Sequence, residues 1–387
     1  MFIGFENKRQ EIIMRSFRKT IALITASVLI LASAGCTSRK ATDTNESKTS
    51  DTSASASSSA AETVGLKDMT FESLYGTQIG DFLGRKYTFD GKEIPRILSD
   101  YAILNEFSEI TSYAVQGYAP VTSEGFLDMY ANYEGEEFET YGAFVVDFAQ
   151  SMLESQCIMV KMANDAGITL PQEQLDMIED DIKQLQEQLD KEGVTMEQFL
   201  SIMYGEGTTV DEIRELMKTQ ALAEYYTSIY IQNYQFTEDE IMRPKIRYAL
   251  YSAPQGTDQE TLDAQKAKAQ ALMEECNGNL DSFEVLGSAA QTNGEVHQYG
   301  EIIEAGNTVQ NFQIWANDSA RKEGDFDVIY APEYGYFVVA YAGLGEVDET
   351  TKQDIATKAL MNSISADEES GKYSFGTTDS YPVTLPD

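Results

Sequence analysis

The first two thirds of the chain carry apolar residues every three or four positions, a spacing typical of amphipathic helices. We expect helices at Ile94–Tyr113, from Glu137 to about Asp165, and from Pro171 to Gly193. Proline is tolerated in the first turn of a helix and glycine commonly ends one. Both residues therefore support the third helix, which would begin at Pro171 and end at Gly193. The second helix shows the spacing through Phe138, Tyr141, Phe144, Phe148 and Met152, and the third through Leu175, Ile178, Ile182, Leu185 and Leu189.

Further helix starts are marked by three capping boxes, in which a hydroxyl caps the first turn and an acid or amide reaches back. The pairs are Thr195 with Gln198, Thr209 with Glu212, and Thr237 with Glu240. These signals predict a region that is entirely helical, with methionine and tyrosine in its interior. Met203 and Met217 are expected in that core, while a methionine surface suited to varied clients remains the alternative.

After Pro244 the pattern changes to alternating strands and short helices. Lys245–Ala253 is strand-like, and an alanine- and lysine-rich helix follows at Thr261–Cys276. A short helix in LDSFEVLGSAA, an extended stretch at 295–301, a short helix in TVQNFQIWA, and the strands FDVIYA and YGYFVVAYAG complete the series. The predicted order is βααβαββ, within the size of one ordinary domain. A last helix is expected at Glu349–Ile364.

The N-terminal part reads as a secretory signal followed by a tether. MRSFRKTIALITASVLILASAGC, ending at Cys36, has a cationic start, an apolar stretch too short for a permanent span, and a small-residue cleavage site. Residues 37–63 are about half serine and threonine and lack large apolar side chains, which predicts a flexible leash. Cysteine directly after Ser-Ala-Gly resembles the lipobox of bacterial lipoproteins, which implies that Cys36 is acylated.

Charge and composition argue against several classes of function. The net charge is −36, and because Met1–Gly35 carries a net +3, its removal would leave −39. Such a body is repelled by nucleic acid and by anionic lipid head groups, so no nucleic-acid partner is expected. A solvated acidic surface is the simplest interpretation, and attraction of cationic unfolded clients is the alternative.

Few residues are available for metal or nucleophilic chemistry. His297 is the only histidine, and Cys157 and Cys276 are the only cysteines besides Cys36. No metal site, cofactor site or Ser-His-Asp arrangement is therefore expected. We interpret Cys157 and Cys276 as buried small apolar residues, with one long-range disulfide as the alternative.

The series from the first strand to RKEGDFDVIYAPEYGYFVVAY resembles the parvulin-type peptidyl-prolyl isomerases, whose domain ends in a turn and a Gly-Tyr-His strand. The helical region, tether and lipobox resemble PrsA-like foldase lipoproteins and SurA-type periplasmic chaperones. The resemblance covers roughly 138–345. It implies an α+β fold, in which an all-α chaperone-like domain carries an inserted parvulin-like βααβαββ domain and is completed by a returning C-terminal helix.

The expected domains follow from this resemblance. Residues 1–35 are a signal peptide, 36–63 the lipidated cysteine and tether, 64–243 the helical domain, 244–345 the parvulin-like domain, and 346–387 the returning helix and tail. Whether 64–135 belongs to the helical domain or forms a separate cap is left open.

The sequence departs from the parvulin pattern where the chemistry would be. Active members carry a histidine on the first strand and another on the last, and the matching positions here are Leu250 and Phe337. Glu295 matches the family's acidic residue, and His297 stands where a glycine would be. Because two apolar residues can replace a buried hydrogen-bonded pair at little cost, the fold should persist while the reactivity is weakened or lost. The substrate-binding candidates are Phe312, Trp315, Thr308 and Phe337. Core packing is the alternative for Phe312 and Trp315 and the favoured interpretation of Phe337.

The favoured function is a lipid-anchored foldase or holdase outside the cytoplasm, on the outer face of the bacterial cell membrane, with weak or absent isomerase activity. Its partners would be unfolded or partly folded secreted polypeptides, and it would meet the membrane through its anchor only. An active isomerase and a solute- or ligand-binding lipoprotein are the alternatives, and a homodimer is left open.

Overall fold

The computed structural model describes residues 65–135, 137–306 and 308–377. The signal peptide, Cys36 and the tether lie outside these described residues. The described chain forms two compact units. The helical unit contains the residues up to Tyr230 and from Leu360 onward, and the sheet unit is Ile231–Ala359. The domain boundaries expected from the sequence lie at 243 and 345, close to the start of β3 (Met242–Ser252) and the end of β6 (Gly335–Glu346). The boundaries between the compact units lie in the flanking helices, after Tyr230 and before Leu360.

The helical unit holds the long helices that the apolar spacing predicts. They are α3 (Arg96–Tyr113), α4 (Tyr141–Asp165), α5 (Gln172–Glu192), α6 (Met196–Tyr204) and α7 (Val210–Asn233, whose last residues enter the sheet unit). Short turns precede them, at η1 (Leu66–Asp68), α2 (Phe71–Tyr75) and η2 (Ile79–Phe82), and η3 (Ala114–Tyr118) follows α3. Pro171 stands one position before α5, and Gly193 closes that helix with φ 65°.

Capping accounts for where several of these helices start. The Thr140 hydroxyl accepts the Ala143 amide at the start of α4. Thr195 and Gln198 form the predicted box, in which the backbone amide of Gln198 donates to the Thr195 hydroxyl at 3.1 Å. Thr209 and Glu212 are likewise reciprocal, since the Glu212 carboxylate accepts the Thr209 amide at 2.9 Å. The third box, Thr237 with Glu240, is also present, but it begins only the four-residue helix α8 (Glu238–Ile241).

A small sheet that the sequence did not predict also belongs to the helical unit. Its strands are β1 (Tyr87–Phe89), β2 (Lys92–Glu93) and β7 (Phe375–Thr377), in the order β2-β1-β7 with antiparallel pairing. The region expected to be all-α is therefore mainly helical, with a three-stranded sheet closed by the chain's C-terminal segment.

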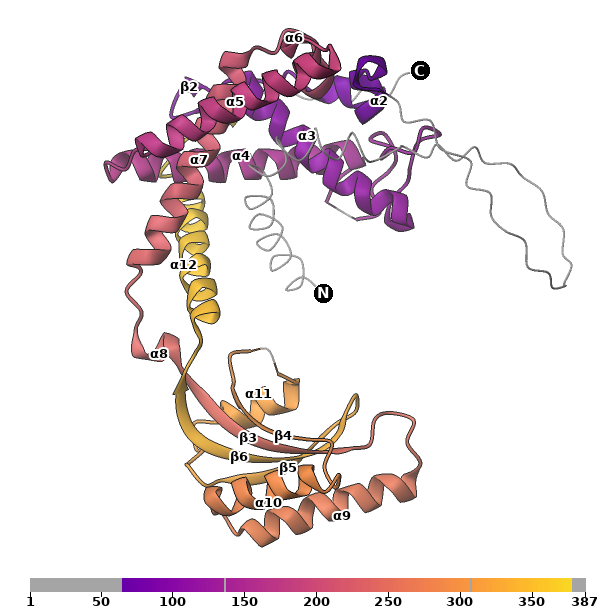
Figure 1. Ribbon diagram of the computed structural model, residues 1–387, viewed down its shortest axis with the longest axis vertical. Helices are drawn as coiled ribbons and strands as arrows, with labels where there is room; N and C mark the ends of the chain where they lie inside the picture. The colour runs from indigo at the N-terminus through magenta and orange to yellow at the C-terminus, as the bar shows by residue number, and fades with distance from the viewer. Residues whose placement is uncertain (1–64, 136, 307, 378–387) are drawn as a thin grey trace, which may run out of the picture. The chain divides into compact units, whose positions relative to one another are not determined.

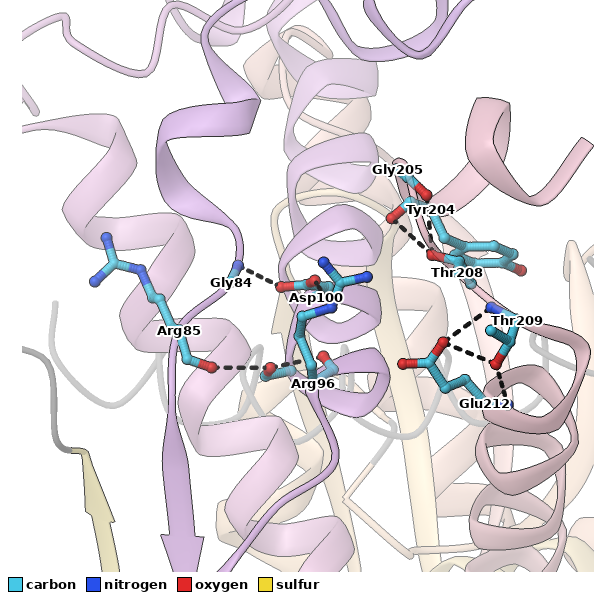
Figure 2. A network of polar contacts seen from close by, with 10 residues as sticks. Gly84, Arg85, Arg96, Asp100, Tyr204, Gly205, Thr208, Thr209 and Glu212 are labelled. Carbon is cyan, nitrogen blue, oxygen red and sulfur yellow. Dashed lines mark hydrogen bonds and ion pairs between the residues drawn. The ribbon is translucent and has the colours of Figure 1, made fainter. Parts of the chain in front are cut away.

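A network of polar contacts fixes the segment that leads into β1 (Figure 2). The Gly84 amide donates to Asp100 at 2.6 Å, and the Ser99 hydroxyl donates to the Arg85 carbonyl at 3.2 Å. Arg96 forms an ion pair with Asp100 at 3.6 Å. Burial raises the pKa of Asp100, and the Gly84 amide and Arg96 oppose that shift. These contacts attach the segment at 84–85 to the first turns of α3.

The C-terminal helix α12 (Glu349–Glu369) contributes its second half to the helical unit. Leu360, Met361 and Ile364 are buried in one apolar cluster with Ile158 and Met159 of α4. The Ser155 hydroxyl donates to Glu368 at 2.9 Å, which adds a polar contact between the same two helices.

The sheet unit shows the predicted order βααβαββ. Its elements are β3 (Met242–Ser252), α9 (Gln259–Cys276), α10 (Leu280–Thr292), β4 (Gln298–Ile303), α11 (Gln310–Ala316), β5 (Phe326–Ala331) and β6 (Gly335–Glu346). The strand order is β4-β3-β6-β5 and every pairing is antiparallel. Helices α9 and α10 cover one face and α11 lies on the other (Figure 1). The α+β fold class is therefore confirmed.

Both cysteines within the described residues are free thiols, so the alternative of a disulfide does not hold. Burial raises the pKa of Cys157 to about 12, with Glu154 adding to the shift, and raises that of Cys276 to about 11. The raised pKa values favour the protonated, apolar form of both thiols, but only Cys276 is buried as the first interpretation expects, whereas Cys157 is partly buried.

Glu106 on α3 should make the stability of the helical unit depend on pH. Its side chain is 2% exposed, and its Oε2 has no hydrogen-bond partner among the described residues. Burial, reinforced by Glu109, raises the pKa of Glu106 to about 8. A raised carboxyl pKa stabilises the fold below the unfolded pKa of about 4.3, and this contribution is lost as the pH rises to about 8.

Glu106→Gln should therefore reduce the fall in thermal midpoint between about pH 5 and about pH 9, as followed by far-ultraviolet circular dichroism. The control is Glu93→Gln, because Glu93 is exposed. Equal pH dependence in Glu106→Gln and the wild type would show that Glu106 is not buried as a neutral acid.

Candidate functional site

The two positions expected to match the parvulin histidines lie opposite each other on neighbouring strands. Leu250 of β3 pairs with Phe337 of β6 in the antiparallel register, so their side chains share the face covered by α11. Leu250 is 5% exposed and Phe337 is 7% exposed. The positions converge, but the residues on them belong to a packed apolar cluster.

Helix α11 supplies the aromatic side chains that complete this cluster. The Phe312 ring meets the Phe337 ring edge-on, with centroids 4.6 Å apart. Trp315 and Ala316 are buried in the same cluster, together with Ile246, Ile329 and Val339 of the sheet. The Asn311 side chain donates to the Tyr330 carbonyl at 2.9 Å and so ties α11 to β5. Phe312 and Trp315 thus belong to the same buried cluster as Leu250 and Phe337.

Trp315 lies at the end of the cluster, next to a cation. The Arg321 guanidinium carbon is 4.5 Å from the centre of the indole ring, and its Nε donates to the Trp315 carbonyl at 3.0 Å. The indole Nε1 is buried and has no hydrogen-bond partner among the described residues.

Thr308 belongs to a different set of contacts. Its hydroxyl donates to the carboxylate of Glu304, which also accepts the Gly306 amide at 2.6 Å. The Gln313 side chain donates to the Thr308 carbonyl at 2.7 Å. These bonds hold the turn before α11, and the Thr308 hydroxyl is engaged there with Glu304, a buried side chain.

The acidic candidate and the only histidine lie outside the cluster. Glu295 and His297 are exposed residues just before β4. The His297 amide donates to the Leu250 carbonyl at 2.7 Å, so its backbone extends the pairing of β3 with β4 while its imidazole is exposed. His297 is therefore a surface residue.

Two tyrosines flank the buried cluster. The rings of Tyr248 and Tyr334 each lie 6.1 Å from Phe337, and Tyr334 is 49% exposed. The Tyr248 hydroxyl accepts a hydrogen bond from Gln298 at 2.8 Å, and burial raises the pKa of Tyr248. This edge can contact an apolar or prolyl side chain.

The described residues hold no group of three or more His, Cys, Asp or Glu side chains arranged to bind a metal ion. No helix in the described part of the chain is both long and apolar enough to cross a membrane.

Sequence reasoning did not find a pocket of about 300 Å³ in the helical unit, lined by residues of α5 and α7. The sequence predicts that Ile178 and Met217 face inward, and both are buried, yet both also line this pocket. Periodicity shows which side of a helix is apolar, but it does not show where two helices leave a space between them.

Comparisons with known proteins gave no match to a family model and no match to a curated protein. Solved structures do match, and they include both families that the sequence resembles. PrsA peptidylprolyl isomerase from Bacillus cereus is 17% identical, with 63% of this chain and 90% of that chain covered and a TM-score of 0.25.

The PrsA foldase protein from Lactococcus lactis is 16% identical over 74% of this chain and 87% of its own, with a TM-score of 0.23. A SurA-like chaperone from Campylobacter jejuni is 11% identical over 76% of this chain and 99% of its own, with a TM-score of 0.20.

The packing of Phe337 can be tested by truncation. Phe337→Ala should lower the free energy of unfolding of the sheet unit by about 3 to 5 kcal/mol, because it removes a buried ring from a filled cluster. Tyr334→Ala, on the exposed edge, should change it by less than about 0.5 kcal/mol. Trp315 is the only tryptophan, so denaturant titration followed by its fluorescence reports this cluster. A neutral Phe337→Ala would mean that the ring lines an open cleft.

Proposed function

We propose that this protein is a foldase or holdase outside the cytoplasm, which binds unfolded or partly folded secreted polypeptides and has little or no prolyl isomerase activity. The observation that carries the proposal is the buried pair Leu250 and Phe337, which lie opposite each other where a parvulin would carry its two histidines. The sheet and its covering helices are kept, while the groups that could hydrogen-bond a reacting amide are replaced by hydrocarbon.

The physical demands of isomerisation support this interpretation. Rotation about a peptide bond must cross a barrier of about 18 to 20 kcal/mol, and a catalyst has to bind the twisted amide better than the planar one. The cluster of Leu250, Phe312 and Phe337 is already packed, and the rings of Tyr248 and Tyr334 lie at its edge. A prolyl segment could contact this edge, but little there would distinguish the twisted amide from the planar one.

The proposed location outside the cytoplasm rests on the N-terminal sequence. The cationic and apolar leader and the cysteine at position 36 fit an acylated protein, and residues 37–63 would hold the folded part near the outer face of the membrane. The solved structures to which the chain is similar are described as a peptidylprolyl isomerase, a foldase and a SurA-like chaperone. In this proposal the present chain shares the chaperone role and not the catalytic one.

Two assays on the purified protein without its leader test the proposal. In a proline-peptide isomerisation assay, the rate should equal that of buffer, and Phe312→Ala should not change it. In an aggregation assay with a reduced, unfolded secreted protein, stoichiometric amounts should suppress light scattering. A rate above buffer that Phe312→Ala abolishes would establish an active isomerase instead. Failure to suppress aggregation of any secreted client would remove the chaperone role.

A further inference from the structure

The pocket of the helical unit combines an apolar wall with two acidic side chains. Helix α5 contributes Met177, Ile178 and Asp181, and α7 contributes Met217, Glu224 and Tyr225. Met177 is 55% exposed at the edge of the pocket, whereas Met217 is 8% exposed and Ile178 is 6% exposed. A volume of about 300 Å³ is at the small end of ligand pockets and suits one long side chain with its neighbours.

Neither pocket carboxylate is neutralised by the protein. Asp181 and Glu224 form no ion pair and no hydrogen bond with any residue in the described part of the chain. The same two helices carry four cations, Lys183, Lys191, Arg214 and Lys218, but none of them lines the pocket, and the Arg214 guanidinium pairs with Glu179 at 2.7 Å and with Asp211. The acids of the pocket are therefore left without a positive partner.

Because Asp181 and Glu224 are partly buried, ionising them without a nearby cation costs free energy. Burial raises the pKa of Glu224 to about 7, and burial together with Asp180 raises the pKa of Asp181. An ionised carboxylate that has lost part of its water is stabilised most by a cation that donates hydrogen bonds to it.

We propose that this pocket binds an arginine or lysine side chain of an extended polypeptide, and that apolar neighbours of that residue rest on Met177 and Met217. This inference rests on the proposed function and specifies the clients, which would be secreted chains with a cationic residue next to apolar ones. The methylene stem of the cation lies along the methionines, and its charged end reaches Asp181 and Glu224.

The charge of the whole chain favours the same ligand. It carries 64 acidic and 28 basic residues, so cationic segments are attracted from a distance and anionic ones are repelled. Methionine is flexible and polarisable, so it can adapt to different apolar neighbours of the cation. The acidic side chains thus select a cationic residue of the bound polypeptide, while the apolar wall accepts different apolar residues next to it.

The probes are two blocked peptides, Leu-Arg-Leu and Leu-citrulline-Leu, which differ only in that citrulline is a neutral isostere of arginine. Binding to the protein without its leader is measured by isothermal titration calorimetry. At about pH 8 the arginine peptide should bind about tenfold more tightly than the citrulline peptide, since a charge-assisted hydrogen bond is lost in the latter.

Glu224→Gln should reduce that preference at least about fivefold, and the matched control Glu215→Gln, an exposed acid of α7 outside the pocket, should leave it unchanged. For the wild type, affinity for the arginine peptide should fall as the pH drops through about 7, because protonation neutralises Glu224. Asp181 is the other titrating carboxylate that lines the pocket, and Asp181→Asn should weaken binding in the same direction.

Equal affinity for the two peptides, or equal loss in Glu224→Gln and Glu215→Gln, would overturn the inference. Comparing the peptides on the wild type needs no variant, so a misfolded mutant cannot hide the answer. Aggregation suppression without a preference for arginine would overturn this pocket's role and leave the proposed function standing. A preference for arginine without aggregation suppression would support the pocket and remove the chaperone function.

Discussion

The pairing of β3 with β6 is the constraint on which the sheet unit depends. Because the register places Leu250 opposite Phe337, whatever occupies one position must be compatible with the other and with Phe312 above them. A single buried imidazole beside a phenylalanine would leave a polar group without a partner, which costs about 1 to 3 kcal/mol. Two apolar residues avoid that cost and let the rings pack edge-on. The pairing therefore accommodates two apolar residues at these positions, with α9 and α10 on one face of the sheet and α11 on the other.

The helical unit, unlike the apolar cluster of the sheet unit, retains acidic side chains that are partly or fully buried. Its acidic side chains are placed where burial raises their pKa, at Glu106 inside α3 and at Glu224 beside the pocket. Glu106 lies in the interior, so its burial bears on stability alone. Glu224 borders a pocket, so the same physical effect can be relieved by a ligand. In the proposed function, clients contact an apolar edge of the sheet unit and an acidic apolar pocket of the helical unit.

Much of this architecture could be predicted from the sequence, because its signals are local. The apolar spacing, the three capping boxes and the alternation after Pro244 gave the long helices and the order βααβαββ. The small sheet of β1, β2 and β7 was missed because its strands are two or three residues long and Tyr87 pairs with Thr377 across most of the chain.

The site residues differ in how far the sequence could place them. Phe312, Trp315, Leu250 and Phe337 could be placed near one another through the resemblance to parvulins. Thr308 could not, because its hydrogen bond to Glu304 depends on the turn before α11. The α5 and α7 pocket also has no local signal, since it arises from the spacing of two helices.

The sheet face beneath α11 is a filled apolar interior and not an open cleft. Trp315 is the only tryptophan and belongs to that cluster with 6% of its surface exposed, so its fluorescence in the intact chain reports the cluster directly. The native protein should therefore emit at short wavelength and be quenched only weakly by acrylamide. Emission and quenching like those of the unfolded chain would instead show that water reaches Trp315 and that the cluster is open.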